Sequence, residues 1–160
     1  MSQFARVIRL DESDLNVFDP AADIGEWAIS GAFAFSDWSE GDLTGKARQA
    51  FANGWLGLET FGRVTFVAVT QVEEAEAEAL TDALAGHFVT YYGAPDVDAT
   101  RPVAEAEIAH MAELCDEHDP NVLLTVAREL TEAGVKEAFR VIEPQEAELD
   151  LLAVHGSLDD

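Results

Sequence analysis

The sequence predicts an α+β fold in one domain over residues 1–160: a mostly antiparallel sheet of about five or six strands with three helices packed on one face. Three observations predict it. The segment 63–72 is rich in Val, Thr and Phe, as strands are. It runs directly into two long segments with helical spacing of apolar residues. Strand-like segments both precede and follow these helices, an order that favours antiparallel pairing.

The first half of the chain predicts two strands and a short helix before residue 63. A largely apolar, alternating segment at 4–10 predicts the first strand, which stops at an acidic turn. The aromatic-rich segment 26–35 predicts the second strand, in which Gly31 marks a bend or a close backbone approach. Helical spacing predicts a helix over 45–52 with Thr44 as its N-cap.

Two long helices follow the strand at 63–72. The first is predicted over 73–92, because apolar residues recur at helical spacing and Gly93 follows as a stop signal. The second is predicted over 102–118, with Pro102 near its start.

The segment 122–143 also fits a helical period, but a β-hairpin explains it better. With the loop at 131–134, five facing pairs match in apolar character or opposite charge. These pairs are Leu130 with Val135, Glu129 with Lys136, Arg128 with Glu137, Val126 with Phe139, and Leu124 with Val141. Beyond the hairpin, 149–155 predicts a final strand and 157–160 a frayed tail.

The charge of the chain excludes several partners. Its 32 Asp and Glu against 9 Lys and Arg give a formal net charge of -23. Because phosphate backbones and anionic lipids attract clusters of basic residues, we expect neither nucleic acid nor a membrane as partner. A cation or a basic protein would suit such a surface. Cys115 is the only cysteine and no segment has the character of a signal peptide or a membrane span, so we expect a soluble, cytoplasmic protein.

The helix predicted over 102–118 carries candidate metal ligands. Glu107 and His110 stand at i and i+3 beside an apolar stripe, a spacing that lets a carboxylate and an imidazole reach one metal. His118 is the third candidate, and Cys115, Asp119 or His87 could add a further ligand. The alternative explanation is a hydrogen-bonded pair at the helix edge, since buried polar groups are usually satisfied.

Aromatic residues suggest a ligand pocket. His87 and Tyr91 lie one turn apart on their helix. Trp27, Trp38 and Trp55 flank an acidic loop, so an aromatic cleft with an acidic rim would suit a cationic ligand. Two alternatives would explain these aromatic residues without a ligand. They could simply pack in the core, or a homodimer could bury the face that contains Trp27 and Phe33.

Four segments resemble a small bacterial family of about this length that has no assigned function. They are Arg9-Leu10-Asp11, the run GEWAISGAFAF at 25–35, Gly45-Lys46-Ala47-Arg48 and Glu137-Ala138-Phe139-Arg140. The resemblance implies no activity.

No complete catalytic constellation is present. The Gly-Lys at 45–46 lacks the Ser or Thr of a phosphate loop, and no Gly-x-Ser-x-Gly elbow frames a serine. We therefore expect a non-enzymatic cytoplasmic binding or accessory protein without a cofactor. The alternative is a metal-binding protein or metal-dependent enzyme that uses a divalent metal at Glu107, His110 and His118.

Overall fold

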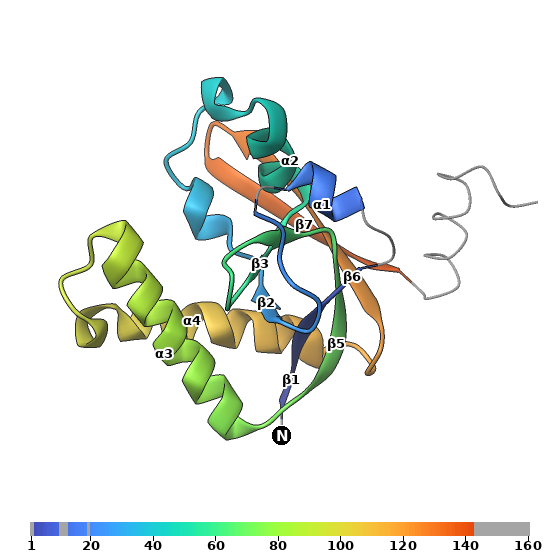
Figure 1. The fold of residues 1–160 in the computed structure, drawn as a ribbon, viewed down its shortest axis with the longest axis vertical. Helices are drawn as coiled ribbons and strands as arrows, with labels where there is room; N and C mark the ends of the chain where they lie inside the picture. Colours follow the sequence, from blue (N-terminus) through green and yellow to red (C-terminus); the bar gives the residue numbers. More distant parts are fainter. Residues whose placement is uncertain (1, 10–12, 19, 143–160) are drawn as a thin grey trace, which may run out of the picture.

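The computed structural model describes residues 2–9, 13–18 and 20–142. In these ranges the chain forms seven strands. They are β1 Ser2–Ile8, β2 Trp27–Ile29, β3 Trp55–Gly57, β4 Arg63–Val64, β5 Phe66–Val72, β6 Leu123–Thr131 and β7 Gly134–Ile142. All seven join one sheet in the order β4-β3-β2-β1-β5-β6-β7, with antiparallel pairing throughout. The sheet curls into a half-barrel (Figure 1).

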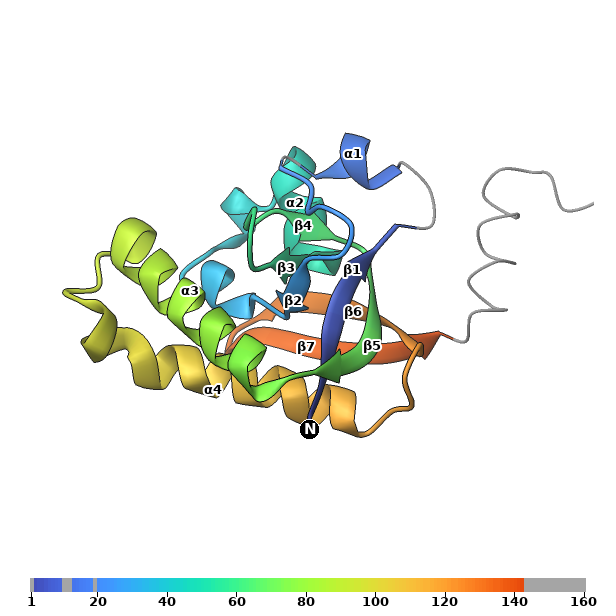
Figure 2. The same cartoon turned by 60° about the horizontal axis from the view of Figure 1, so that its bottom comes forward.

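Four α-helices complete the part of the chain that the structure describes. They are α1 Ser13–Val17, α2 Gly45–Asn53, α3 Glu74–Tyr92 and α4 Val97–Asp116, with short 3-10 helices at Ala32–Phe35 and Glu40–Asp42. The helices form two groups (Figure 2): α3 and α4 pack together with α4 against β1, whereas α2 packs against β6 and lies near α1. The α+β class is confirmed, but the sheet has more strands and the fold more helices than predicted.

One hydrophobic core joins the sheet to α3 and α4. Its largest fully buried side chains come from strands and helices alike: Phe4, Ile29, Trp55, Leu84 and Met111. None of the described helices is both long and apolar enough to cross a bilayer.

The predicted hairpin is confirmed. All five predicted pairs are facing residues of β6 and β7, and Thr131 and Gly134 also pair, so the turn itself is Glu132 and Ala133. This hairpin carries the buried Arg128 on β6.

The predicted strand at 26–35 is wrong in its second half. Pairing ends at Ile29, and a 3-10 helix follows at Ala32–Phe35. Gly31 causes the change because its φ is 73°, a left-handed conformation that ends extended structure. The expected close approach is confirmed: a Cβ at Gly31 would lie 2.5 Å from Leu56 Cβ and 2.8 Å from Arg63 Nη1.

The predicted strand at 63–72 is interrupted by a tertiary contact. Thr65 separates β4 from β5, and its hydroxyl and backbone N–H donate to the buried Asp14 carboxylate at 2.7 and 3.2 Å. Asp14 lies in α1, a helix that the sequence pattern did not predict.

The two long helices are confirmed, but α4 begins before its predicted start and ends at Asp116, two residues before its predicted end. The helix α3 ends as expected at Gly93, whose φ is 72°. The helix α4 begins at Val97, five residues before the predicted start, because the Asp96 side chain caps it by accepting from Ala99 N at 2.7 Å. Pro102 therefore lies inside α4.

Two further predictions have other outcomes. Thr44 does precede α2, but its side chain makes no capping hydrogen bond. The predicted strand at 149–155 and the tail at 157–160 lie outside the described residues.

Gly31→Ala is expected to destabilise the fold by at least about 2 kcal/mol, because it combines a strained positive φ with a clash against Leu56. Gly86→Ala is the matched control. Gly86 lies inside α3 with nothing within 4 Å of its Cβ position, so alanine there should be neutral or stabilising by about 0.5–1 kcal/mol. Urea unfolding followed by circular dichroism measures both, and equal midpoints for the two variants would contradict the expectation.

Candidate functional site

Two buried arginines lie together where β4, β6 and α2 meet. Arg63 extends from β4 and Arg128 from β6, and both donate to the same two carbonyl oxygens. Arg63 Nη1 lies 3.1 Å and Arg128 Nη1 2.8 Å from the oxygen of Gly54. The carbonyl of Ser30 also accepts from both side chains. The carbonyl groups of Ser30 and Gly54 thus hold two guanidinium groups side by side.

The ring of Phe35 lies against both cations. Its centroid is 4.6 Å from Cζ of Arg63 and 5.4 Å from Cζ of Arg128. The negative face of an aromatic ring attracts such cations, and more strongly where water is excluded. We name Arg63, Arg128 and Phe35 the arginine cluster.

Only one of the two arginines has a carboxylate partner. Arg128 Nε lies 2.8 Å from Glu137 Oε2, and Glu137 also accepts from the Ser30 hydroxyl. Arg63 forms no ion pair with any residue that the structure describes. Burial and, to a smaller extent, the charge of Arg128 lower the pKa of Arg63 to about 9. The cluster therefore holds one positive charge more than its carboxylates balance.

A pocket of about 500 Å³ opens beside Arg63. Its walls are aromatic and apolar, and its lining includes two basic residues and no acidic one among those described. The lining residues are Pro20, Ala34, Phe35, Trp38, Lys46, Ala47, Ala50, Phe61, Arg63 and Tyr92. We name this the Arg63 pocket. In a chain with 32 acidic and 9 basic residues, such a lining is unusual.

A buried carboxylate shapes one wall of the Arg63 pocket. Glu26 is 2% exposed and accepts hydrogen bonds from the backbone N–H groups of Glu59 and Thr60, each at 2.8 Å. These bonds hold the loop between β3 and β4, in which Phe61 has a φ of 56°. Such a conformation is rare for a non-glycine residue and needs the support of its surroundings.

His87 supports Phe61 from outside the pocket. The two rings stack with centroids 3.7 Å apart and planes 2° from parallel, and Tyr91 lies 4.9 Å from His87 on the same helix. Burial and the charge of Arg63 lower the pKa of His87. His87 Nδ1 is buried and has no hydrogen-bond partner among the described residues.

The five predicted ligand-binding residues do not form one site. Trp38 lines the Arg63 pocket, and His87 with Tyr91 lies behind its Phe61 wall. Trp55 is fully buried and stacks on Phe139. Trp27 is buried as well.

Trp27 packs against Phe4 and under the guanidinium of Arg6, whose Cζ lies 4.0 Å from the ring centroid. Phe33 contacts Phe88 of α3 with ring centroids 4.9 Å apart. Both rings of the predicted dimer face thus pack against the same chain, and a homodimer stays a prediction.

A second hollow resembles the aromatic cleft with an acidic rim that the sequence predicts. It has a volume of about 460 Å³ and includes Trp38, Glu40 and Glu132, with no basic residue among the described residues that line it. It lacks a buried polar group, so the Arg63 pocket is the stronger candidate site.

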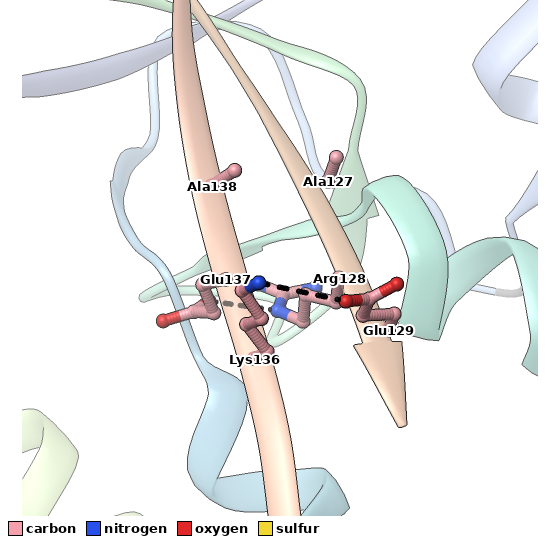
Figure 3. A pocket seen from close by; sticks show the side chains of 6 residues that line it. All are labelled: Ala127, Arg128, Glu129, Lys136, Glu137 and Ala138. Carbon is pink, nitrogen blue, oxygen red and sulfur yellow. Dashed lines mark hydrogen bonds and ion pairs between the residues drawn. The ribbon is translucent and has the colours of Figure 1, made fainter. Parts of the chain in front are cut away.

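A third hollow, with a volume of about 280 Å³, is lined by residues of β6 and β7 that include Ala127 and Ala138 (Figure 3). The charged residues that line it are already paired. Glu129 faces Lys136 at 3.8 Å, and Arg128 faces Glu137. This hollow therefore offers a ligand no unpaired charge.

The predicted metal ligands are only partly brought together. Glu107 lies near His110, whose charge lowers the pKa of Glu107 against the larger, raising effect of burial. In the described parts of the chain, no three His, Cys, Asp or Glu side chains are grouped to hold a metal ion. Cys115 is buried with its pKa raised to about 12, and the backbone carbonyl of His118 accepts from Gln3. A metal at Glu107, His110 and His118 stays a prediction, which metal analysis of the purified protein would test.

The arginine cluster was missed by the sequence reasoning, although one signal for it was present. In the predicted hairpin, Arg128 shares a face with Leu124, Val126 and Leu130, so it had to point toward the core. Arg63 gave no comparable signal.

Comparisons with known proteins identify a family and no function. Neither a curated protein nor a solved structure matches the chain. A family model does match, and it covers residues 1–160. The chain therefore belongs to DUF6505, a family of unknown function.

Proposed function

We propose that this protein is a non-enzymatic cytoplasmic binding protein that holds a small organic molecule in the Arg63 pocket. The observation that carries the proposal is a buried guanidinium beside four aromatic side chains around about 500 Å³ of space. Ligand pockets are commonly about 300–1,000 Å³, mostly apolar, with a few fixed polar groups that orient the ligand. The Arg63 pocket has this composition.

The lining favours binding over catalysis. Among the described residues, neither a carboxylate, an imidazole, a thiol nor a serine hydroxyl lines the pocket. These are the groups that most often act as nucleophile or general base. Arg63, held by carbonyl oxygens, is suited to recognise a ligand rather than to transfer a proton.

The proposal is tested with a panel of small aromatic probes: 2-naphthoate, 2-naphthamide, phenyl phosphate and benzylammonium. Binding is measured by thermal shift and by quenching of tryptophan fluorescence, since Trp38 lines the pocket. At a concentration 100 times its Kd, a ligand stabilises the native state by about 2.7 kcal/mol.

Ala47→Leu narrows the pocket and should abolish the effect. Ala106→Leu is the matched control, because Ala106 is exposed on α4 and lines no part of the pocket. We expect at least one probe to shift the wild type and the control but not Ala47→Leu. No shift with any probe, or equal shifts in all three proteins, would overturn the proposal.

The acidic hollow at Trp38, Glu40 and Glu132 is the second candidate site, and a cationic ligand suits it. Benzylammonium is its probe in the same panel. Binding of benzylammonium alone, with loss on Glu132→Gln and none on Ala47→Leu, would move the site to this hollow.

A further inference from the structure

We infer that the ligand of the Arg63 pocket is an organic monoanion: a carboxylic acid with an aromatic or apolar body, its carboxylate paired with Arg63. The inference rests on the proposed function and names the class of ligand. Three features of the arginine cluster and its pocket lead to it.

The first feature is the charge balance of the cluster. Arg63 and Arg128 are 8% and 6% exposed, and among the described residues Glu137 is the one carboxylate that pairs with either. An unpaired buried charge destabilises the fold. Proteins therefore pair it with an opposite charge or place it where a ligand supplies that charge. Acidic residues are abundant in this chain, yet none of those described is placed at Arg63. One negative charge would balance the cluster.

The second feature is the set of donors that Arg63 keeps free. A guanidinium has five N–H groups. Among the described residues, Nη1 of Arg63 donates to Ser30 and Gly54, and Nη2 donates to Gly31. The Nε–H and one Nη2–H remain without a described acceptor. Two N–H groups of one guanidinium are what a carboxylate accepts when it pairs with arginine bidentately.

The backbone is built to hold Arg63 in this position. A Cβ at Gly31 would lie 2.8 Å from Arg63 Nη1, and a Cβ at Gly54 would lie 3.0 Å from Arg63 Cβ. Side chains at these two glycines would displace the arginine. Its guanidinium is thus fixed before any ligand arrives, which lowers the entropy cost of binding.

The third feature is the rest of the lining. Lys46 is exposed and forms no ion pair with a described residue, so it adds a second positive charge that can attract an anion. Trp38, Phe61 and Tyr92 line the remaining space. Such walls suit an apolar body of one or two rings. A phosphate monoester carries about 1.5–2 negative charges at pH 7, more than the cluster lacks.

The test uses isothermal titration calorimetry to compare two isosteric probes, 2-naphthoate and neutral 2-naphthamide, with phenyl phosphate as a third probe of higher charge. We expect naphthoate to bind at least about tenfold more tightly than naphthamide, because only the acid pairs with Arg63. Arg63→Met should remove this preference. Equal binding of acid and amide would overturn the inference and leave the proposed function standing, whereas binding of none of the probes in the panel would remove both.

A second pair of variants covers the case in which Arg63→Met does not fold. Lys46→Met should weaken naphthoate about two- to fivefold without affecting naphthamide, as expected for an exposed charge. Arg48→Met is the matched control, since Arg48 is exposed on the same helix and does not line the pocket. Tighter binding of phenyl phosphate than of naphthoate, or equal losses in Lys46→Met and Arg48→Met, would also overturn the inference.

Discussion

Arg128→Ala is expected to destabilise the protein by about 3–5 kcal/mol, the cost of breaking a buried charge pair. The Arg128 side chain is fully buried and donates to the carbonyls of Phe51, Gly54 and Ser30. It also pairs with Glu137 at 2.8 Å. Alanine would leave the largely buried Glu137 carboxylate, whose side chain is 18% exposed, without its partner, and the carbonyls would lose a donor. The cost therefore comes from the groups left behind as much as from the lost contacts.

The matched control for Arg128→Ala lies on the same hairpin. Lys136 faces Glu129 at 3.8 Å, but the two side chains are 72% and 66% exposed, so Lys136→Ala should cost less than about 1 kcal/mol. Urea unfolding of both variants measures their free energies of unfolding for this comparison. If Arg128→Ala lost no more stability than Lys136→Ala, the arginine cluster would not be a buried, structured site. The double variant Arg128→Met with Glu137→Leu should recover part of the loss, because it leaves no charge unpaired.

The parts of the fold that could be predicted are those with local causes. The hairpin register follows from alternation along β6 and β7 and from a two-residue turn, so five pairs could be aligned from the sequence. The end of α3 follows from Gly93, which takes the left-handed conformation that closes many helices. In both cases the determining residues are neighbours in the chain.

The incorrect boundaries have tertiary causes. The break between β4 and β5 depends on the hydrogen bonds from Thr65 to Asp14, which lies 51 residues earlier in the chain. The end of β2 depends on how closely Gly31 approaches Leu56 and Arg63. The pattern at 26–35 alternates as a strand does, and only the packing against a distant residue shows why it bends.

The candidate site was hard to predict for the same reason. Trp38, Lys46, Phe61, Arg63 and Tyr92 come from two helices, two loops and a strand. Of these, Trp38 was predicted as an aromatic ligand contact, but for a cation rather than for an anion. The acidic composition of the chain favours cationic ligands. Composition does not show, however, that two of the few basic residues, Arg63 and Arg128, are buried together.

Glu26→Ala is expected to lower stability by about 3 kcal/mol or more, because it removes one acceptor group from several buried donors. Glu26 accepts from the backbone N–H groups of Asp23, Glu59 and Thr60 and from the Thr60 hydroxyl. With alanine, the N–H groups of the β3–β4 loop lose their acceptor. Glu26→Gln keeps one oxygen for Glu59 and Thr60, and we expect about half the loss.

The same substitution tests whether the loop and the pocket are coupled. Phe61 lines the Arg63 pocket with a φ of 56°, and the bonds from Glu59 and Thr60 to Glu26 hold the loop that presents it. If Phe61 is positioned in this way, Glu26→Ala should weaken naphthoate binding at temperatures where the variant is still folded. Glu59→Ala removes an exposed side chain of the same loop and should change neither stability nor binding. Stability measured by urea unfolding and affinity measured by calorimetry should therefore fall together in Glu26→Ala. A destabilised variant that keeps its affinity for naphthoate would show that the buried carboxylate does not position Phe61, and a variant with unchanged stability would contradict the expected loss of buried hydrogen bonds.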